Sequence, residues 1–305
     1  MFRKHTRRAA KAAFAISTGV ALLLGGTASA ARQQAAATPT VTIGTKNFTE
    51  QYVLGQLYKQ ALEAKGYKVV YKENIGSSEL IDTALKSGKI NFYPEYTGVI
   101  VADLAKLPAP KSAAAAYAAA KKFEEGRGNT LLKATPFYDS DSFGMLTSTA
   151  NKLGVKTISD MKNVKSFSFA GYPECRTRIT CLLGLKQIYG LTQTKFVPLG
   201  SISVYTLLDQ GKITAGDVFS TDPQLISKKY TILTDTKHIF GFQNVAPVVS
   251  QKLASDGGAG FASVVNAVSA KLSIKAMIAM NKAVAIDKKS PEDVASAFLT
   301  ANKLK

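Results

Sequence analysis

Hydrophobic residues recur along the chain with two spacings, in short β-branched runs and in longer segments of helical period. The run at 41–43 is apolar and β-branched, whereas 49–65 repeats apolar residues three and four positions apart. Strands are predicted again at 68–72 and 90–93, with a helix at 78–87 between them. This β-α-β-α-β order predicts parallel strands in one sheet with helices on both faces.

The same alternation starts again near residue 143, after an alanine-rich helix at 113–125. Further strands are predicted at 144–147, 166–170, 195–199, 215–219 and 230–233, and helices at 159–163, 180–189 and 203–210. The chain after Pro247 is predicted to be helical. Ser290 followed by Pro291 marks a helix start, because Ser caps free N–H groups and Pro fits the first turn. Two alternating blocks predict two α/β lobes.

Residues 1–30 have the three parts of a secretory signal peptide. Basic residues are followed by an apolar run from Ala12 to Gly26 and by small residues that place cleavage near Ala30. The run is shorter than the ~20 apolar residues of a spanning helix. Residues 31–39 are predicted to be a flexible linker, and the protein is expected at the periplasm or the extracytoplasmic face of the membrane. Thr6-Arg7-Arg8 leaves Sec and twin-arginine export both open.

The net charge of the chain does not alter this interpretation. Removing the five basic residues of the predicted signal peptide from the formal net charge of +18 leaves +13. A basic surface suits nucleic acid, an acidic membrane surface or an anionic ligand. The lysines, however, are spread over every predicted helix instead of being clustered with aromatic residues. We therefore interpret them as solvated faces and expect no nucleic-acid partner.

Cys175 and Cys181 are close together in the exported part of the chain. In an oxidising compartment such a pair is most simply a disulfide. A zinc site is the weaker alternative, because His238 is the one histidine after the signal peptide and zinc normally takes four ligands. The sequence thus predicts a short stapled loop and no metal site.

The sequence contains few of the motifs that are typical of catalytic sites. The chain has no Gly-x-Ser-x-Gly elbow, and a Ser-His-Asp system would have to use His238. Ser159 and Lys162 match Ser-x-x-Lys, but a capped helix explains that spacing better. The glycine-rich run 257–260 lacks the preceding strand of a phosphate-binding loop. We expect no catalytic residue and no cofactor.

Five motifs together resemble one known family. They are IGTKNFTEQYVLG at 43–55, GSS at 76–78, YPEYTG at 93–98, FSTD at 219–222 and NVAPVV at 244–249. In this order they resemble the glycine betaine/carnitine/choline-binding receptors of ABC importers, over essentially residues 40–305. The resemblance implies an α/β fold of the type II periplasmic-binding class, with two lobes and a hinge of two crossover strands. It places lobe one at 40–142 and 244–305, and lobe two at 143–243.

The resemblance also implies a function. Such a receptor closes its lobes on a small quaternary-ammonium osmoprotectant, such as glycine betaine, choline or carnitine, and delivers it to the transmembrane permease subunit of an ABC importer. A trimethylammonium group donates no hydrogen bonds, so aromatic faces and a carboxylate must hold it. A ligand carboxylate requires Arg or Lys. We expect a monomer.

Seven residues fall on the family's ligand positions. By resemblance, Lys46 and Arg178 contact a ligand carboxylate, Asp141 is the acidic residue, Tyr96, Phe143 and Phe219 are aromatic walls, and Gln243 stands at the fourth wall. Phe143 and Phe219 replace tyrosines, and Gln243 replaces an aromatic residue. These departures leave glycine betaine, choline, carnitine and a less cationic solute all open.

Two other classes of function remain open from the sequence. One is a secreted enzyme on the same bilobal fold, with Asp141 or Glu174 as acid or base. The other is a ligand sensor docked to a signalling protein. A second well-placed catalytic group is missing from the sequence, which favours the importer receptor.

Overall fold

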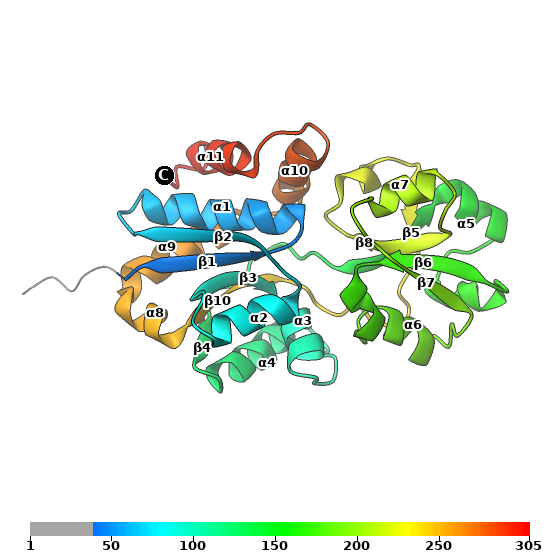
Figure 1. Ribbon diagram of the computed structural model, residues 1–305, viewed down its shortest axis with the longest axis horizontal. Coiled ribbons are helices and arrows are strands. Elements are labelled where there is room, and N and C mark those ends of the chain that lie inside the picture. Colours follow the sequence, from blue (N-terminus) through cyan, green and yellow to red (C-terminus); the bar gives the residue numbers. More distant parts are fainter. Residues whose placement is uncertain (1–38) are drawn as a thin grey trace, which may run out of the picture. The chain divides into compact units, whose positions relative to one another are not determined.

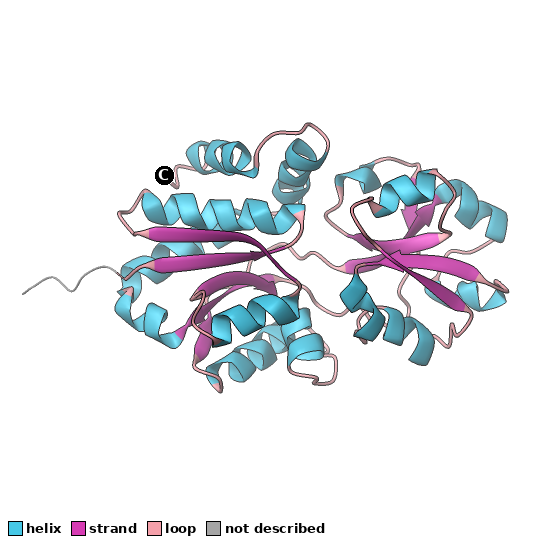
Figure 2. Cartoon of the chain, in the orientation of Figure 1, coloured by secondary structure: helices cyan, strands magenta, loops and turns pink. Residues whose placement is uncertain are grey.

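The computed structural model describes residues 39–305, so the predicted signal peptide and nearly all of the predicted linker lie outside the described residues. Within the described part, the strands form two five-stranded sheets, one in each lobe (Figure 1). Helices cover both faces of each sheet (Figure 2). The predicted bilobal α/β fold is confirmed.

The sheet of lobe one contains four strands that run in the same direction and one antiparallel strand, β10. Its order is β2-β1-β3-β10-β4, with β1 Val41–Lys46, β2 Val69–Gly76, β3 Phe92–Tyr96, β4 Asn129–Leu131 and β10 Val245–Ser250. β1 pairs in parallel with β2 and β3, as predicted, whereas β10 is antiparallel to β3 and β4. The helical prediction after Pro247 is therefore wrong for 248–250. Val248 and Val249 are fully buried there, where β-branched side chains pack well in a sheet.

The sheet of lobe two repeats this arrangement. Its order is β7-β6-β8-β5-β9, with β5 Asp141–Leu146, β6 Phe167–Gly171, β7 Thr194–Pro198, β8 Ala215–Phe219 and β9 Tyr230–Ile232. β6 pairs in parallel with β7 and β8, and β5 is antiparallel to β8 and β9. Because β5 begins at Asp141, this residue belongs to the sheet of lobe two, two positions before the expected boundary.

The helices follow the apolar periodicity of the sequence. In lobe one they are α1 Thr49–Glu63, α2 Ser78–Lys86, α3 Thr97–Val99 continued by a π turn at Ile100–Leu104, α4 Ala113–Glu125, α8 Gln251–Asp256, α9 Gly258–Lys271, α10 Ile274–Ala285 and α11 Pro291–Ala301. Val53, Leu54 and Leu57 of α1 are fully buried in the core of this lobe. The predicted start of α11 is confirmed, since Ser290 Oγ accepts a hydrogen bond from the Asp293 N–H at 3.0 Å.

Lobe two has shorter helices. They are α5 Thr147–Leu153, α6 Leu182–Gln187 and α7 Val204–Asp209, with 3₁₀ turns at Ile158–Asn163, Pro173–Thr177 and Pro223–Ile226. The core of this lobe includes an aromatic cluster, in which the ring of Phe143 lies 5.0 Å from that of Phe169 and 6.0 Å from that of Phe167. Each lobe thus has its own hydrophobic core.

Two chain segments connect the lobes, one from β4 to β5 and one from β9 to β10, and they contact each other. The Asp139 N–H donates to the Gln243 carbonyl at 3.1 Å, and Tyr138 and Asn244 form an antiparallel bridge. The Asn244 side-chain amide donates to the carbonyls of Thr135 and Phe137, both at 3.1 Å. These contacts form a paired two-segment hinge.

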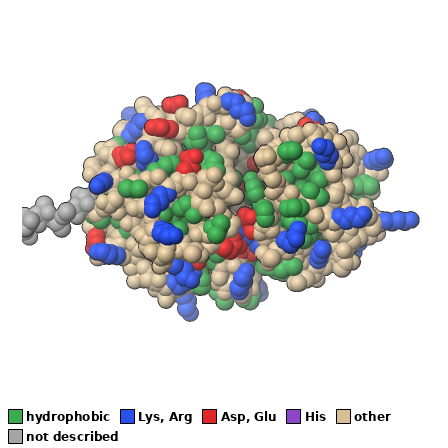
Figure 3. Space-filling view, in the orientation of Figure 1, with side chains coloured by type: hydrophobic (Ala, Val, Ile, Leu, Met, Phe, Trp, Pro, Cys, Tyr) green, Lys and Arg blue, Asp and Glu red, His purple; other side chains and the backbone are tan. Residues whose placement is uncertain are grey.

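Basic side chains do not gather in one place on the visible surface. On the face shown in Figure 3, Lys and Arg side chains are spread over both lobes. Among residues 39–305, no single helix is long and apolar enough to cross a membrane, and α9 with α10 qualify only as a pair that is bent by 87°.

Candidate functional site

A cavity of about 50 Å³ lies between the lobes, at the edge where the parallel strands of both sheets end. Side chains at or just after the carboxyl ends of β1, β2 and β3 line it from lobe one, and those after β6 and at β8 line it from lobe two. The antiparallel strand β5 contributes from its first residue, Asp141. In α/β sheets this carboxyl edge is where ligands bind.

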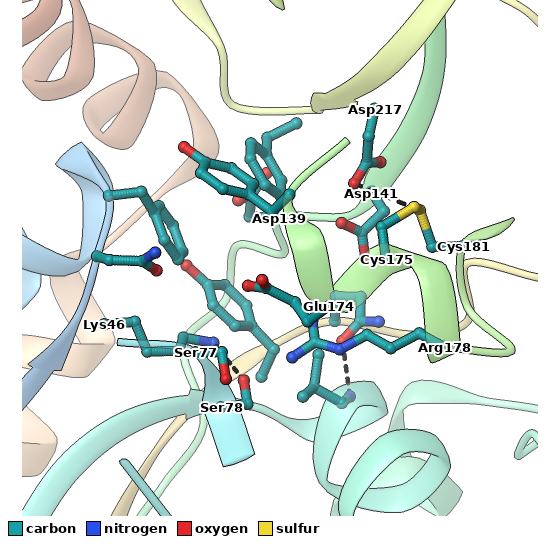
Figure 4. A pocket seen from close by; sticks show the side chains of 17 residues that line it. Lys46, Ser77, Ser78, Asp139, Asp141, Glu174, Cys175, Arg178, Cys181 and Asp217 are labelled. Carbon is teal, nitrogen blue, oxygen red and sulfur yellow. Dashed lines mark hydrogen bonds between the residues drawn. A yellow bond between two sulfur atoms is a disulfide. The ribbon is translucent and has the colours of Figure 1, made fainter. Parts of the chain in front are cut away.

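Lys46 is the last residue of β1, and its ammonium group is buried in the cavity wall (Figure 4). Nζ donates to Glu95 Oε1 at 2.5 Å and to Ser78 Oγ at 3.2 Å. It also lies 4.2 Å from the ring centroid of Tyr96 and 5.6 Å from that of Phe48. The ring faces of this cavity therefore already contact a cation, within the ~6 Å range of cation–π attraction.

Four aromatic residues line the cavity: Phe48, Tyr96, Tyr172 and Phe219. Phe48 and Tyr96 belong to lobe one, and their ring centroids are 6.2 Å apart. Tyr172 and Phe219 belong to lobe two, with centroids 6.3 Å apart. Phe48 and Phe219 stack directly on each other across the lobes. The rings form one continuous series from one lobe to the other.

Four carboxylates also line the cavity: Asp139, Asp141, Glu174 and Asp217. Glu174 extends from lobe two toward the side chains of lobe one (Figure 4). Burial raises the pKa of Asp141 to about 6, although the charges of Arg178 and Lys46 oppose this shift. Burial also raises the pKa values of Asp139 and Asp217 well above their usual range. Buried carboxyl groups of this kind are stabilised in their charged form by an additional cation.

Arg178 lies in the loop that follows β6, and it reaches across to lobe one. Nε and one terminal nitrogen donate to the carboxylate of Glu79 in α2, at 3.0–3.2 Å. The predicted disulfide is present, since Cys175 and Cys181 are joined on either side of this arginine. The bridge fixes the loop that carries both Glu174 and Arg178.

Gln243 lines the cavity, but its amide is engaged with the main chain. Oε1 accepts from the Val99 N–H at 3.1 Å, and Nε2 donates to the Phe240 carbonyl at 2.9 Å. The fit is tight, because a Cβ at Gly98 would lie 2.7 Å from the Gln243 side chain. This close approach explains the glycine of the Tyr-Thr-Gly motif. Gln243 thus connects the hinge to lobe one, and its side chain does not serve in place of an aromatic wall.

Phe143 does not line the cavity, contrary to the expectation from resemblance. It is fully buried in the core of lobe two, against Phe167 and Phe169. The physical reason is its place along β5. Asp141 begins this strand at the cavity edge, whereas Phe143 is two residues further into the sheet, where the same face is covered by the core.

The structure brings the other predicted residues together: Lys46, Tyr96, Asp141, Arg178, Phe219 and Gln243 all line one cavity. Sequence reasoning missed Phe48 and Tyr172 as ring walls, and Asp139 and Asp217 as carboxylates. Phe48 comes two residues after β1, and Tyr172 comes directly after β6. A signal was therefore available, because residues just beyond the carboxyl ends of parallel strands converge on one edge.

A second cavity of about 480 Å³ adjoins the first and shares Phe48, Phe219, Tyr172, Asp139 and Asp217 with it. Loop 199–203 of lobe two and part of α10 complete its wall. The stacked pair of phenylalanines thus faces both spaces. The larger space has the size of typical small-molecule sites, which are roughly 300–1,000 Å³.

The sulfur atoms of Cys175 and Cys181 lie close to a carboxylate of Asp217, an arrangement that superficially resembles a metal site. Cys181 Sγ is 3.5 Å from Asp217 Oδ2. Metal-binding cysteines must be thiolates, whereas these two sulfurs are bonded to each other. The disulfide accounts for this cluster.

Comparison with known proteins gives one family. The family model described as "Substrate binding domain of ABC-type glycine betaine transport system" matches residues 39–301. The "Glycine-betaine-binding protein" of Pseudomonas aeruginosa is 31% identical over 277 residues, which cover 87% of this chain and 88% of that protein. The "Carnitine transport binding protein OpuCC" of Listeria monocytogenes is 25% identical and covers 86% of this chain and 87% of that protein.

Solved structures agree in fold. A "glycine betaine/carnitine/choline ABC transporter" structure has a TM-score of 0.69 at 22% identity, covering 87% of this chain and 99% of that chain. An "ABC-transporter choline binding protein in complex with choline" has a TM-score of 0.67 at 16% identity, covering 87% of this chain and 89% of that chain. At these identities the likeness shows the bilobal fold.

Proposed function

The chain belongs to the family of substrate-binding domains of ABC-type glycine betaine transport systems, and we propose that it captures a small quaternary-ammonium solute between its lobes. The observation that carries the proposal is the combination of aromatic faces and carboxylates around one interlobe cavity. A quaternary ammonium group has no hydrogen-bond donor, so it gains little from polar sites built of acceptors alone. Ring faces and nearby negative charge are what remain to bind it.

The expected contact energies are large enough for the affinity of a transport receptor. Each cation–π contact with a desolvated ring contributes ~0.5–2 kcal/mol. Contacts with Phe48, Tyr96, Tyr172 and Phe219 would together supply much of the roughly 8 kcal/mol of a micromolar affinity. The Tyr96 ring face is suited to a cation, because the Lys46 ammonium already lies 4.2 Å from it, and Glu95 neutralises the charge of that ammonium.

Binding requires the lobes to move. A cavity of about 50 Å³ is smaller than the roughly 300–1,000 Å³ of typical small-molecule sites. We propose that the lobes separate at the hinge, that the ligand enters from the adjoining larger cavity, and that closure then places it among the rings. Hinge closure of this kind buries the ligand and changes the surface that a partner contacts.

The partner in this proposal is the transmembrane permease subunit of an ABC importer, which receives the ligand from the closed receptor. The protein acts as a monomer, without a cofactor or catalytic step, at the extracytoplasmic side of the membrane. Removal of the predicted signal peptide near Ala30 is part of the same proposal. Acid–base catalysis by Asp141 or Glu174 is not proposed, because a receptor role uses both carboxylates as negative charge for the ligand.

A thermal-shift screen tests the ligand class. We expect choline, glycine betaine, carnitine, proline betaine or ectoine to raise the melting temperature of the purified protein, with a quaternary-ammonium compound giving the largest increase. Stabilisation should follow ligand concentration as mass action requires. Stabilisation by a sugar, a neutral amino acid or a peptide, with no effect of any quaternary ammonium compound, would contradict the proposal.

A further inference from the structure

Both cationic residues that line the cavity have carboxylate partners within the described chain. Lys46 Nζ is 2.5 Å from Glu95 Oε1, and both side chains are buried. Arg178 uses Nε and one terminal nitrogen on Glu79, at 3.2 Å, 3.1 Å and 3.0 Å. Neither Glu95 nor Glu79 is among the residues that line the cavity. The positive charges of the site are therefore already balanced before a ligand arrives.

Further contacts hold the Arg178 pair in place. Ser77 Oγ donates to Glu79 Oε2 at 2.6 Å, which fixes the carboxylate at the start of α2. Asp103 Oδ2 lies 4.0 Å from Arg178 Nε, and it accepts from Thr180 Oγ1 at 2.8 Å. Although burial disfavours the charged form of Glu79, its bonds to Arg178 hold the pKa of this carboxyl at about 2. Arg178 thus faces two carboxylates of lobe one.

Every other Asp, Glu, Lys or Arg side chain that lines the cavity is acidic. Asp139, Asp141, Glu174 and Asp217 line it without a basic partner in any ion pair of the described residues. A ligand with a single positive charge finds compensating carboxylates here. A ligand that also has a carboxylate must place it beside these acids, or must compete with Glu79 for Arg178.

We propose that Glu79 is a specificity-determining residue, whose carboxylate occupies the Arg178 position that a ligand carboxylate would need. The pocket then favours quaternary-ammonium alcohols such as choline over zwitterionic betaines. This inference rests on the proposed function. The discrimination is a repulsive one, in which a fixed like charge excludes one ligand class.

The test is a charge-removing substitution with two ligands. Glu79→Gln keeps the size of the side chain and an oxygen that can accept a hydrogen bond from Arg178. It removes the negative charge that neutralises the arginine. Calorimetry of the purified wild-type and variant proteins gives the dissociation constants of choline and glycine betaine. We expect the ratio of the betaine constant to the choline constant to fall roughly tenfold or more in the variant.

A matched control is Asp256→Asn, which removes a carboxylate from the exposed Lys252–Asp256 pair on α8, outside the cavity. It should leave the ratio unchanged. The side chain of Glu79 is 43% exposed, so Glu79→Gln should fold normally, and its melting curve checks this.

The outcomes separate the inference from the proposed function. Suppose that the wild-type protein binds choline and that Glu79→Gln changes the affinities for both ligands by the same factor or leaves both unchanged. Glu79 then acts only in the contact between the lobes, and the inference is overturned. Wild-type protein that binds glycine betaine as tightly as choline also contradicts it. If neither ligand binds wild type or variant, the proposed function fails, and the inference fails with it.

Discussion

The rings of Phe48 and Phe219 stack on each other with centroids 5.4 Å apart and planes 7° from parallel. Phe48 follows β1 in lobe one, and Phe219 ends β8 in lobe two, so this contact joins the lobes through aromatic faces alone. A cation can reach the two ring faces that contact each other only if the rings separate. Closure of the lobes and binding of the ligand therefore involve the same ring atoms.

Substitutions at Phe219 test whether the ring face contributes as a π system. Phe219→Tyr should retain affinity for the best quaternary-ammonium ligand, because the face is unchanged. Phe219→Leu keeps apolar character but loses the quadrupole, and should cost about 1–2 kcal/mol of binding free energy. Calorimetry measures both. Equal affinity of the Leu and Phe proteins would show that the site uses only apolar contact.

Phe143 should behave differently from the cavity aromatics. Because it lies in the core of lobe two, Phe143→Ala should reduce the free energy of unfolding by about 3–5 kcal/mol. The dissociation constant of the folded variant should stay close to the wild-type value. Urea denaturation and calorimetry separate the two quantities. A large loss of affinity with unchanged stability would show that Phe143 belongs to the binding site.

Affinity should depend on pH through Asp141. Burial raises its pKa to about 6, so the group is largely protonated below that pH and charged above it. Affinity for a cation should therefore rise several-fold as the pH increases through about 6. Asp141→Asn should flatten this part of the profile in calorimetric titrations. A wild-type affinity that falls over the same range would contradict the assignment.

The stability of the ligand-free protein should change in the opposite direction. A carboxyl group whose pKa is raised in the folded state binds its proton more tightly there than in the unfolded chain. Asp141 and Asp222, both with pKa values of about 6, therefore lower the free energy of unfolding as the pH rises from the usual carboxyl range to about 6. Denaturation curves at several pH values check this sign.

The disulfide should matter for both folding and binding. Replacing Cys175 and Cys181 by serine opens a short loop, which costs about 2 kcal/mol of stability in the chain-entropy model. The same change releases the loop that carries Glu174 and Arg178, so affinity should decrease as well. Thiol labelling of unreduced, denatured wild-type protein should detect no free thiol. Two labelled cysteines would show that the bridge does not form.

Much of the fold was predictable, because local periodicity decides its elements. The apolar spacing of 49–65 predicted α1, and β1 to β3 followed from short apolar runs. β4 was missed, since its three residues give too short a pattern. Residues 248–250 of β10 were predicted to be helical, because the strand character of β10 depends on antiparallel pairing with β3, which is distant in sequence.

The site was predictable to a similar degree. Motif positions brought Lys46 and Tyr96 to the cavity, but they could not show how far into the sheet each side chain lies. Phe143 was misplaced for this reason. The partner of Arg178 was also hidden, because Glu79 is 99 positions away and only the packing of the two lobes brings the residues together.

In the proposed binding mode, ring faces and carboxylates recognise the positive charge of the ligand. The most direct measurement compares choline with 3,3-dimethyl-1-butanol, which has the same shape but a neutral carbon in place of the nitrogen. Calorimetry on the wild-type protein should show choline binding at least roughly thirtyfold more tightly, equivalent to ~2 kcal/mol. Equal affinities for the two compounds would show that the cavity recognises shape and apolar surface, and would contradict recognition of positive charge.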